Sequence, residues 1–236
     1  MRLGLNIDHV ATLRNARGGN DPNVIDAALI AQSCKVDGIT THLREDRRHI
    51  KDEDVFKLKE ILNTRLNLEM AATEEMQKIA LELKPAACCI VPERRQEVTT
   101  EGGLDVAGNI KYMKDFVTPL VEAGIQVSLF IDPNINQINA AKKVGAQYVE
   151  LHTGQYSLNF GTYKEKIEFT KLHRAASRAA MLGLGVNAGH GLNYTNVSRM
   201  KELPAIDELN IGHSIISRSV FVGLEKAIEE MQDLIK

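Results

Sequence analysis

The sequence has no excess of charge of one sign, no long hydrophobic run and few cysteines. Its 236 residues carry 29 Lys and Arg against 31 Asp and Glu, a formal net charge of −2 at pH 7. Nucleic-acid and anionic-membrane surfaces usually need a basic excess, which is missing here. No apolar run is long enough to cross a bilayer, and the first residues, MRLGLNID, lack the apolar stretch of a signal peptide. We therefore expect a cytoplasmic protein that binds neither nucleic acid nor membranes.

Three further signals are absent. The cysteines, Cys34, Cys88 and Cys89, are odd in number and form no C-x-x-C pair, which indicates free thiols in a reducing compartment. No glycine-rich phosphate fingerprint follows the first predicted strand, which argues against a dinucleotide-binding fold. No H-x-H or H-E-x-x-H spacing occurs, so the sequence gives no support for a metal site, and we expect none.

What is present is an alternation of short apolar segments with longer amphipathic ones. Alternation of this kind predicts a parallel sheet with helical crossovers. Eight such units in a chain of this size predict an α/β fold of one domain over residues 1–236, a (β/α)8 TIM barrel. The expected strands are residues 3–8, 37–42, 65–69, 86–91, 125–132, 147–152, 184–189 and 208–211. The expected helix signals are caps at Asp21, Asp52 and Thr73, a helix after Asn193, and a final helix over 214–235.

Polar residues gather where the predicted strands end. In TIM barrels the active site is built at the carboxyl ends of the strands. Five of the seven histidines stand at these ends: His9, His42, His152, His190 and His213. A core or surface role would explain any one of them, but five equivalent positions favour a functional site.

A short pattern, Asn-x-Asp-His or Asn-x-Gly-His, recurs at the ends of the first, seventh and eighth strands. Because side chains alternate along a strand, each Asn should point into the barrel and each His should lie above its rim. Asn67 and Glu69 extend the inward polar set on the third strand. Buried polar groups cost free energy unless they are paired, so an ordinary apolar barrel would not need them.

The stretch from Asp37 to His49, DGITTHLREDRRH, runs from a predicted strand into two histidines and three arginines. Arginine presents a planar fork of donors to phosphate, and histidine exchanges protons near neutral pH. The alternative is a solvated charge cluster in which these arginines pair with Glu45 and Asp46. No lysine ends any predicted strand, which argues against a Schiff base between protein and substrate.

Several long motifs together resemble the pyridoxine 5′-phosphate synthase family. They are NIDHVATLRNARG, HLREDRRHI, NLEMA, VPERRQEVTTEGGLDV, GIQVSLFID, VNAGHGL and LNIGH, which span the chain from end to end. Departures are confined to helix faces and to residues 155–163. The resemblance implies a (β/α)8 barrel with extra helices that mediate homo-oligomer contacts, commonly in an octamer. It also implies condensation of 3-amino-2-oxopropyl phosphate with 1-deoxy-D-xylulose 5-phosphate. The products would be pyridoxine 5′-phosphate, inorganic phosphate and water, and no metal or redox cofactor would be needed.

The same resemblance implies roles for individual residues. The catalytic residues would be His42 and Glu69 as proton acceptors and His190 as proton donor. Asn6 would bind the aminoketone phosphate. The sugar phosphate would be bound by Asp8, His9, Arg44, His49 and Thr99, and further substrate-binding positions would be Arg17, Gly191, Gly212 and His213. The long polar segment 92–103 is predicted to be a mobile lid.

Two other classes of function remain open at this point. The first is a metal-dependent hydrolase on the same barrel, with ligands drawn from Asp8, His9, Glu69, His152 and His190. The second is a non-catalytic barrel that binds phosphosugars, in which a buried Glu69 would have little purpose. A turnover assay with both phosphorylated substrates separates these alternatives.

Overall fold

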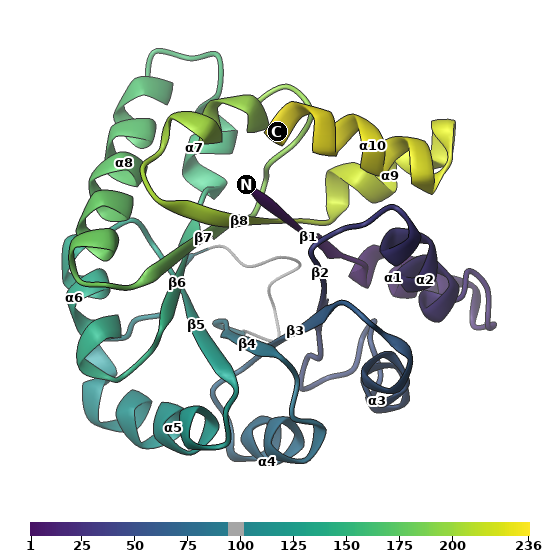
Figure 1. Cartoon of the computed structure of the whole chain (residues 1–236), viewed down its shortest axis with the longest axis horizontal. Helices are drawn as coiled ribbons and strands as arrows, with labels where there is room; N and C mark the ends of the chain where they lie inside the picture. Colours follow the sequence, from purple (N-terminus) through teal and green to yellow (C-terminus); the bar gives the residue numbers. More distant parts are fainter. Residues whose placement is uncertain (94–101) are drawn as a thin grey trace.

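The computed structural model describes residues 1–93 and 102–236, and its strands close into a parallel barrel (Figure 1). Neighbouring strands follow the order of the chain, and β1 pairs with β8 to close the ring. The predicted (β/α)8 barrel is confirmed. The strands are β1 (Arg2–Asn6), β2 (Gly38–His42), β3 (Arg65–Met70), β4 (Ala87–Ile90), β5 (Gln126–Ile131), β6 (Tyr148–His152), β7 (Gly185–Gly189) and β8 (Ile206–Ile211).

Helices surround the barrel on its outside (Figure 1). No helix within the described ranges is both long enough and apolar enough for a membrane span. The α-helices are α1 (Asp8–Arg17), α2 (Val24–Ser33), α3 (Asp52–Ile61), α4 (Glu74–Leu83), α5 (Ile110–Glu122), α6 (Ile135–Lys143), α7 (Gly154–Asn159), α8 (Glu165–Met181), α9 (His213–Val222) and α10 (Leu224–Ile235). Two short 3-10 segments are η1 (Ala107–Asn109) and η2 (Val197–Glu202).

Several helix boundaries differ from the expectation. Asp8 begins α1 instead of ending the first strand, and a short helix, α7, occupies the polar loop after β6. The helix expected after Asn193 is only the 3-10 segment η2. The final helix is broken at Gly223, whose φ of +83° is unfavourable for residues with a side chain, and so becomes α9 and α10.

Two of the three predicted helix caps are wrong. Thr73 caps α4 as expected, because its side chain accepts from the backbone N–H of Met76. The cap of α2 is Asn23 and not Asp21, since Asn23 is the extended residue directly before the helix and accepts from the N–H of Ile25. Asp52 lies inside the first turn of α3 and therefore cannot serve as its cap.

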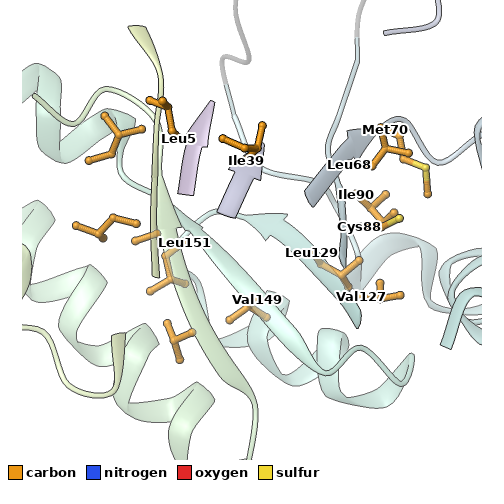
Figure 2. Close-up of a cluster of buried hydrophobic side chains, with 14 of the residues drawn as sticks. Leu5, Ile39, Leu68, Met70, Cys88, Ile90, Val127, Leu129, Val149 and Leu151 are labelled. Atoms are coloured by element: carbon orange, nitrogen blue, oxygen red, sulfur yellow. The ribbon is translucent and has the colours of Figure 1, made fainter. Parts of the chain in front are cut away.

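The outer face of the barrel is apolar and forms the main core. Side chains such as Leu5, Ile39, Leu68 and Val149 alternate along their strands and pack in one cluster with apolar residues of the surrounding helices (Figure 2). Burial of one such side chain contributes about 1.5–3 kcal/mol to folding. The strands are therefore held by their outward faces, which frees the inward faces for polar residues.

The inside of the barrel carries a chain of polar side chains. Asn67 Nδ2 donates to Thr40 Oγ1 (3.3 Å), Thr40 Oγ1 donates to Asn210 Oδ1 (2.9 Å), and Asn210 Nδ2 donates to Glu150 Oε2 (2.6 Å). A Cβ at Gly4 would overlap Asn210 Oδ1, so glycine makes room for this chain. Barrels of this class are usually filled by branched apolar residues. A polar interior indicates that this barrel supports a reaction centre at its carboxyl end.

Candidate active site

The ends of β1, β2 and β3 bring four predicted site residues into one hydrogen-bonded group. Asn6 Nδ2 donates to Asp8 Oδ2 (2.8 Å) and to Glu69 Oε2 (3.4 Å), and Asn6 Oδ1 accepts from the Asp8 N–H (2.9 Å). Asp8 Oδ1 in turn accepts from the backbone N–H of His42 (2.9 Å). His42 and Glu69 are partners in the register of β2 and β3, which places both side chains on the inward face. The amide of Asn6 thus fixes two carboxyl groups relative to each other.

His42 is held by a residue from another loop. Its Nε2 lies 2.7 Å from Glu93 Oε1, and the two side chains are 9% and 4% exposed. The ring of His49 lies 5.9 Å from that of His42, centroid to centroid. Burial, followed by the charges of His42 and Arg44, lowers the pKa of His49 to about 3, so its imidazole is neutral in the free protein. Arg44 is buried beside this group, 3.5 Å from Asp46 through its Nε.

Two buried carboxyl groups, Asp8 and Glu150, and the half-buried Glu69 resist ionisation. Burial raises the pKa of Asp8 to about 6, against the lowering effects of His42 and Asn6. Burial also raises the pKa of Glu150 to about 7, and it raises the pKa of Glu69 well above its ordinary value with help from Glu150 and Asp8. Groups that gain and lose protons near neutral pH are suited to general acid–base chemistry. The site therefore holds protons that it can exchange with a bound molecule.

A second cluster of aromatic rings lies at the ends of β5, β6 and β7. The rings of His152 and His190 meet edge to face at 5.1 Å, and Phe130 packs against both. His152 Nδ1 lies 3.0 Å from Asp132 Oδ1, which fixes the orientation of that ring. Burial and then His152 lower the pKa of His190 to about 4. His190 has a φ of +78°, a strained conformation for a residue with a side chain, which is typical of functional positions.

The loops after β7 and β8 contain Gly191 and Gly212, the two glycines among the predicted substrate-binding residues. Gly212 precedes the first residue of α9, His213, whose ring meets that of His9 at 5.1 Å. A Cβ at Gly212 would lie 2.9 Å from the Cβ of Asn6, so this glycine is needed for close packing. Gly191 has a φ of +79°.

Other predicted contacts are not brought into the cluster. Arg17 is exposed on the last turn of α1, and its side chain forms no hydrogen bond or ion pair with any residue that the structure describes. Thr99 and most of the expected lid, residues 94–101, lie outside the described residues. Arg48 is paired with Asp46, as the charge-cluster alternative expected, whereas Arg47 pairs with Asp52 and Glu75 instead of Glu45 or Asp46. Arg44 alone of the three is buried at the site.

The site residues implied by the resemblance did not include several residues that the structure places beside them. Asp132, Glu150 and His152 were visible as polar strand ends, and their inward direction follows from alternation along β5 and β6. Glu93 had no such signal, because it follows Pro92 in a loop after an apolar strand. Its contact with His42 depends on where the chain after β4 places Glu93, which local sequence does not specify.

One trio in the described part of the chain has donor atoms close enough to consider a metal. The donor atoms of Asp8, His42 and His49 lie within 4.8 Å of one another. His42 is already bonded to Glu93, and Asp8 accepts from Asn6 and from the His42 backbone. These hydrogen bonds engage Asp8 and the ring of His42, and of the trio only Asp8 belongs to the ligand set of the hydrolase alternative.

A closed (β/α)8 barrel with an acid–base cluster at its carboxyl end defines a TIM-barrel enzyme. Solved barrels of similar shape include KGPDC from Streptococcus mutans, with a TM-score of 0.66 and 15% identity over 99% of this chain and 96% of that chain. The tryptophan synthase A-subunit from Pyrococcus furiosus gives a TM-score of 0.64 and 14% identity over 99% of this chain and 97% of that chain. Identities this low support the fold alone.

The particular family follows from closer relatives. The family model of the pyridoxal phosphate biosynthesis protein PdxJ matches residues 3–236, and the chain belongs to this family. The pyridoxine 5′-phosphate synthase of Geobacter sulfurreducens is 55% identical over 235 residues, 100% of this chain and 98% of that protein. The enzyme of the same name from a Synechococcus strain is 56% identical over 232 residues, 98% of this chain and 97% of that protein. The chain is an enzyme of vitamin B6 biosynthesis.

Proposed function

We propose that the polar cluster at the carboxyl end of the barrel closes the pyridine ring of pyridoxine 5′-phosphate. The substrates are 3-amino-2-oxopropyl phosphate and 1-deoxy-D-xylulose 5-phosphate, and phosphate and water leave. The observation that carries the proposal is the hydrogen-bonded group of Asn6, Asp8, His42 and Glu69. Amine–ketone condensation, dehydration and ring closure are proton transfers, which need several acid–base groups around one cavity.

In this proposal His42 and Glu69 accept protons and His190 donates one. The group at the ends of β1–β3 and the group at the ends of β5–β7 differ in chemistry. A carboxylate holds His42 in the first group, whereas a second imidazole faces His190 in the other. Asn6, which donates to Asp8 and Glu69 at the end of β1, would bind the aminoketone phosphate. The imine forms between the two substrates, so no lysine is required at the strand ends.

The phosphorylated substrates need donors in a chain whose net charge is slightly negative. Arg44 is buried at the mouth of the barrel, and a guanidinium there can bind a phosphate through two parallel hydrogen bonds. His9 and His213 lie ring against ring beside the start of α9. The proposed substrate contacts are Asp8, His9, Arg17, Arg44, His49, Thr99, Gly191, Gly212 and His213.

The wider setting of the reaction is part of the proposal. The chain acts as one domain over residues 1–236, without a metal or redox cofactor, and works in the cytoplasm. Its cysteines are free, which is typical of a reducing compartment. It assembles as a homo-oligomer, and we propose an octamer. Large apolar side chains on its surface support assembly, among them Val220 and Phe221, which are 73% and 82% exposed.

The test is a turnover assay with both substrates, read by product absorbance and by phosphate release. We expect product only when both substrates are present, without added metal, and omission of either substrate is the control. Release of phosphate from one substrate alone, dependent on a divalent ion, would support the hydrolase alternative. Tight binding of both substrates without any product would support a phosphosugar-binding barrel.

A further inference from the structure

We propose that Glu93 is a positioning residue for His42, which it holds in one tautomer and supplies with a counter-charge. The inference rests on the proposed role of His42 as a proton acceptor. It concerns how that imidazole is prepared for the reaction, and Glu93 itself is not expected to touch the substrates.

The geometry of the pair is specific. Glu93 Oε1 lies 2.7 Å from His42 Nε2, and both side chains are at least nine-tenths buried. Glu93 Oε2 accepts from the backbone N–H of Glu45 (3.1 Å). Each carboxylate oxygen therefore has its own donor, and the carboxylate plane is fixed relative to the ring. A hydrogen bond between a carboxylate and an imidazole N–H is the usual way in which proteins select a tautomer.

The other ring nitrogen is left for the reaction. With its Nε2–H donated to Glu93, His42 carries its lone pair on Nδ1, and that atom has no hydrogen-bond partner within the described ranges. When Nδ1 takes a proton from the substrate, the ring becomes an imidazolium beside a carboxylate. The proton on Nε2 stays on the ring, and the proton on Nδ1 returns to a later intermediate or to water. The number of protons is balanced, and Glu93 remains ionised throughout.

Other charged groups around His42 do not replace Glu93 in this role. Hydrogen bonding to His42 and to Glu45, opposed by burial, leaves the pKa of Glu93 below its ordinary value, so the carboxylate is ionised at neutral pH. Asp8 accepts a hydrogen bond from the backbone N–H of His42, and its carboxylate lies near the ring without hydrogen-bonding to it. The titratable and charged groups that face His42 from neighbouring elements are Asp8, Arg44, His49, Glu69 and Glu93.

A purely structural role for Glu93 would be to tie its loop to Glu45. The substitution Glu93→Gln separates the two roles, because its amide oxygen can still accept from the Glu45 N–H while the negative charge is lost. The matched control is Glu45→Gln, which removes an exposed carboxylate from the neighbouring loop without touching His42.

The experiment compares the wild type, Glu93→Gln, Glu93→Asp, Glu45→Gln and His42→Asn in the full assembled protein. The pH profiles of kcat and KM are recorded with both substrates. Deuterium exchange at the C2 carbon of each histidine, read by mass spectrometry, reports the pH at which each imidazole titrates, independently of activity. Thermal unfolding checks the fold of every variant.

For Glu93→Gln we expect kcat to fall by at least about tenfold with a small change in KM. We expect the deuterium exchange of His42 to differ from that of the wild type, because the imidazolium has lost its carboxylate. Glu93→Asp should recover part of the rate, and Glu45→Gln should behave like the wild type. Unchanged deuterium exchange of His42 and an unchanged pH profile in a folded Glu93→Gln variant would overturn the inference. A fully active His42→Asn variant would instead show that the proposed role of His42 is wrong.

Discussion

Glu69 lies among groups that oppose its ionisation. Burial, Glu150 and Asp8 all raise its pKa, and only the amide of Asn6 lowers it. A carboxyl group whose pKa is shifted toward the working pH is a better proton acceptor than an ordinary one, because its conjugate base is stronger. The arrangement therefore means that an ionised Glu69 would be a strong base.

We predict that Glu69→Gln folds normally and loses on the order of a hundredfold or more in kcat. Glutamine keeps the size of the side chain and can still accept from Asn6, but it cannot take a proton. Steady-state kinetics with both substrates and a thermal melt give the answer. Near-normal turnover by the folded variant would rule out Glu69 as the base.

The proposed role of His190 as a proton donor and the state of its imidazole in the free enzyme do not coincide. Its lowered pKa means that the free enzyme holds a neutral imidazole, whereas a proton donor must carry the proton that it gives. A phosphorylated substrate would bring negative charge beside the ring and favour its protonated form. The sequence indicated a histidine at this strand end, but its neighbour His152 and its burial became visible only in the structure.

Glu150 gives a stability prediction with a definite sign. Its pKa rises from an ordinary 4.5 to about 7 on folding, so the folded state retains a proton that the unfolded state has lost. The stabilisation that depends on this proton is complete below pH 4.5 and is lost as the pH rises through 7. The full difference corresponds to about 3 kcal/mol.

We therefore predict that Glu150→Gln is about as stable as the wild type near pH 4 and more stable by up to about 3 kcal/mol above pH 8. Its amide oxygen can still accept from Asn210. Urea unfolding at a series of pH values, at one protein concentration, measures the difference. The exposed substitution Glu122→Gln controls for the loss of one negative charge. A stability difference that does not grow with pH would contradict the prediction.

At the scale of elements, strands were easier to predict than helix boundaries. Each strand has an outward face that must be apolar, and this requirement leaves a pattern in the sequence at residues such as Leu66 and Leu68. Helix ends depend on competition between local contacts. From the sequence, Asp8 could end a strand or begin a helix. Its backbone N–H donates to the side-chain oxygen of Asn6, which favours the start of the helix. The break at Gly223 depends on α10 packing against α2 and η2, which are distant in sequence.

The start of α9 carries a prediction about phosphate. The first turn of a helix leaves N–H groups unpaired and carries partial positive charge, which favours anions. No acidic residue stands in the first turn of α9, and the Gly191 loop lies beside it after β7. We predict that phosphate or sulfate from solution binds to backbone N–H groups of Gly191, Gly212 or His213.

A crystal grown with phosphate tests this directly through anion density. Gly212→Val should also raise KM for a phosphorylated substrate, but a side chain there would press on Asn6 as well. The density is therefore the deciding observation. Anion density confined to other loops would place the phosphate site elsewhere.

The whole molecule combines two different interiors. The layer between strands and helices is apolar and maintains the fold, whereas the space inside the barrel is polar and supports the site. The sequence predicted both faces through alternation, since Asn67 and Glu69 are inward while Leu66 and Leu68 are outward. It could not predict cross-strand partners such as Thr40 with Asn210, because that contact joins residues 170 positions apart. Likewise, the contact between Glu93 and His42 depends on the closure of the barrel.

One side of the molecule carries a set of exposed apolar side chains. Helices α1, α2, α9 and α10 lie together there, and α8 lies on the opposite side (Figure 1). Exposed residues on this side are Leu13 (59%), Leu29 (42%), Ile30 (36%), Val220 (73%) and Phe221 (82%). An exposed apolar surface shared by adjacent helices is typical of an interface between subunits. We expect this surface to be one of the contacts of the proposed homo-oligomer.

We predict that Phe221→Ser shifts the assembly toward smaller species, because it removes the most exposed aromatic ring of this surface. Met181→Ser is the matched control, since Met181 is 78% exposed at the end of α8 on the other side. Sedimentation velocity at several micromolar concentrations, with thermal melts to confirm folding, measures both variants beside the wild type. Loss of assembly in Phe221→Ser alone would locate the contact on this side. A wild type that sediments as a monomer would refute the proposed oligomer, and equal effects of both substitutions would show that this surface has no special role.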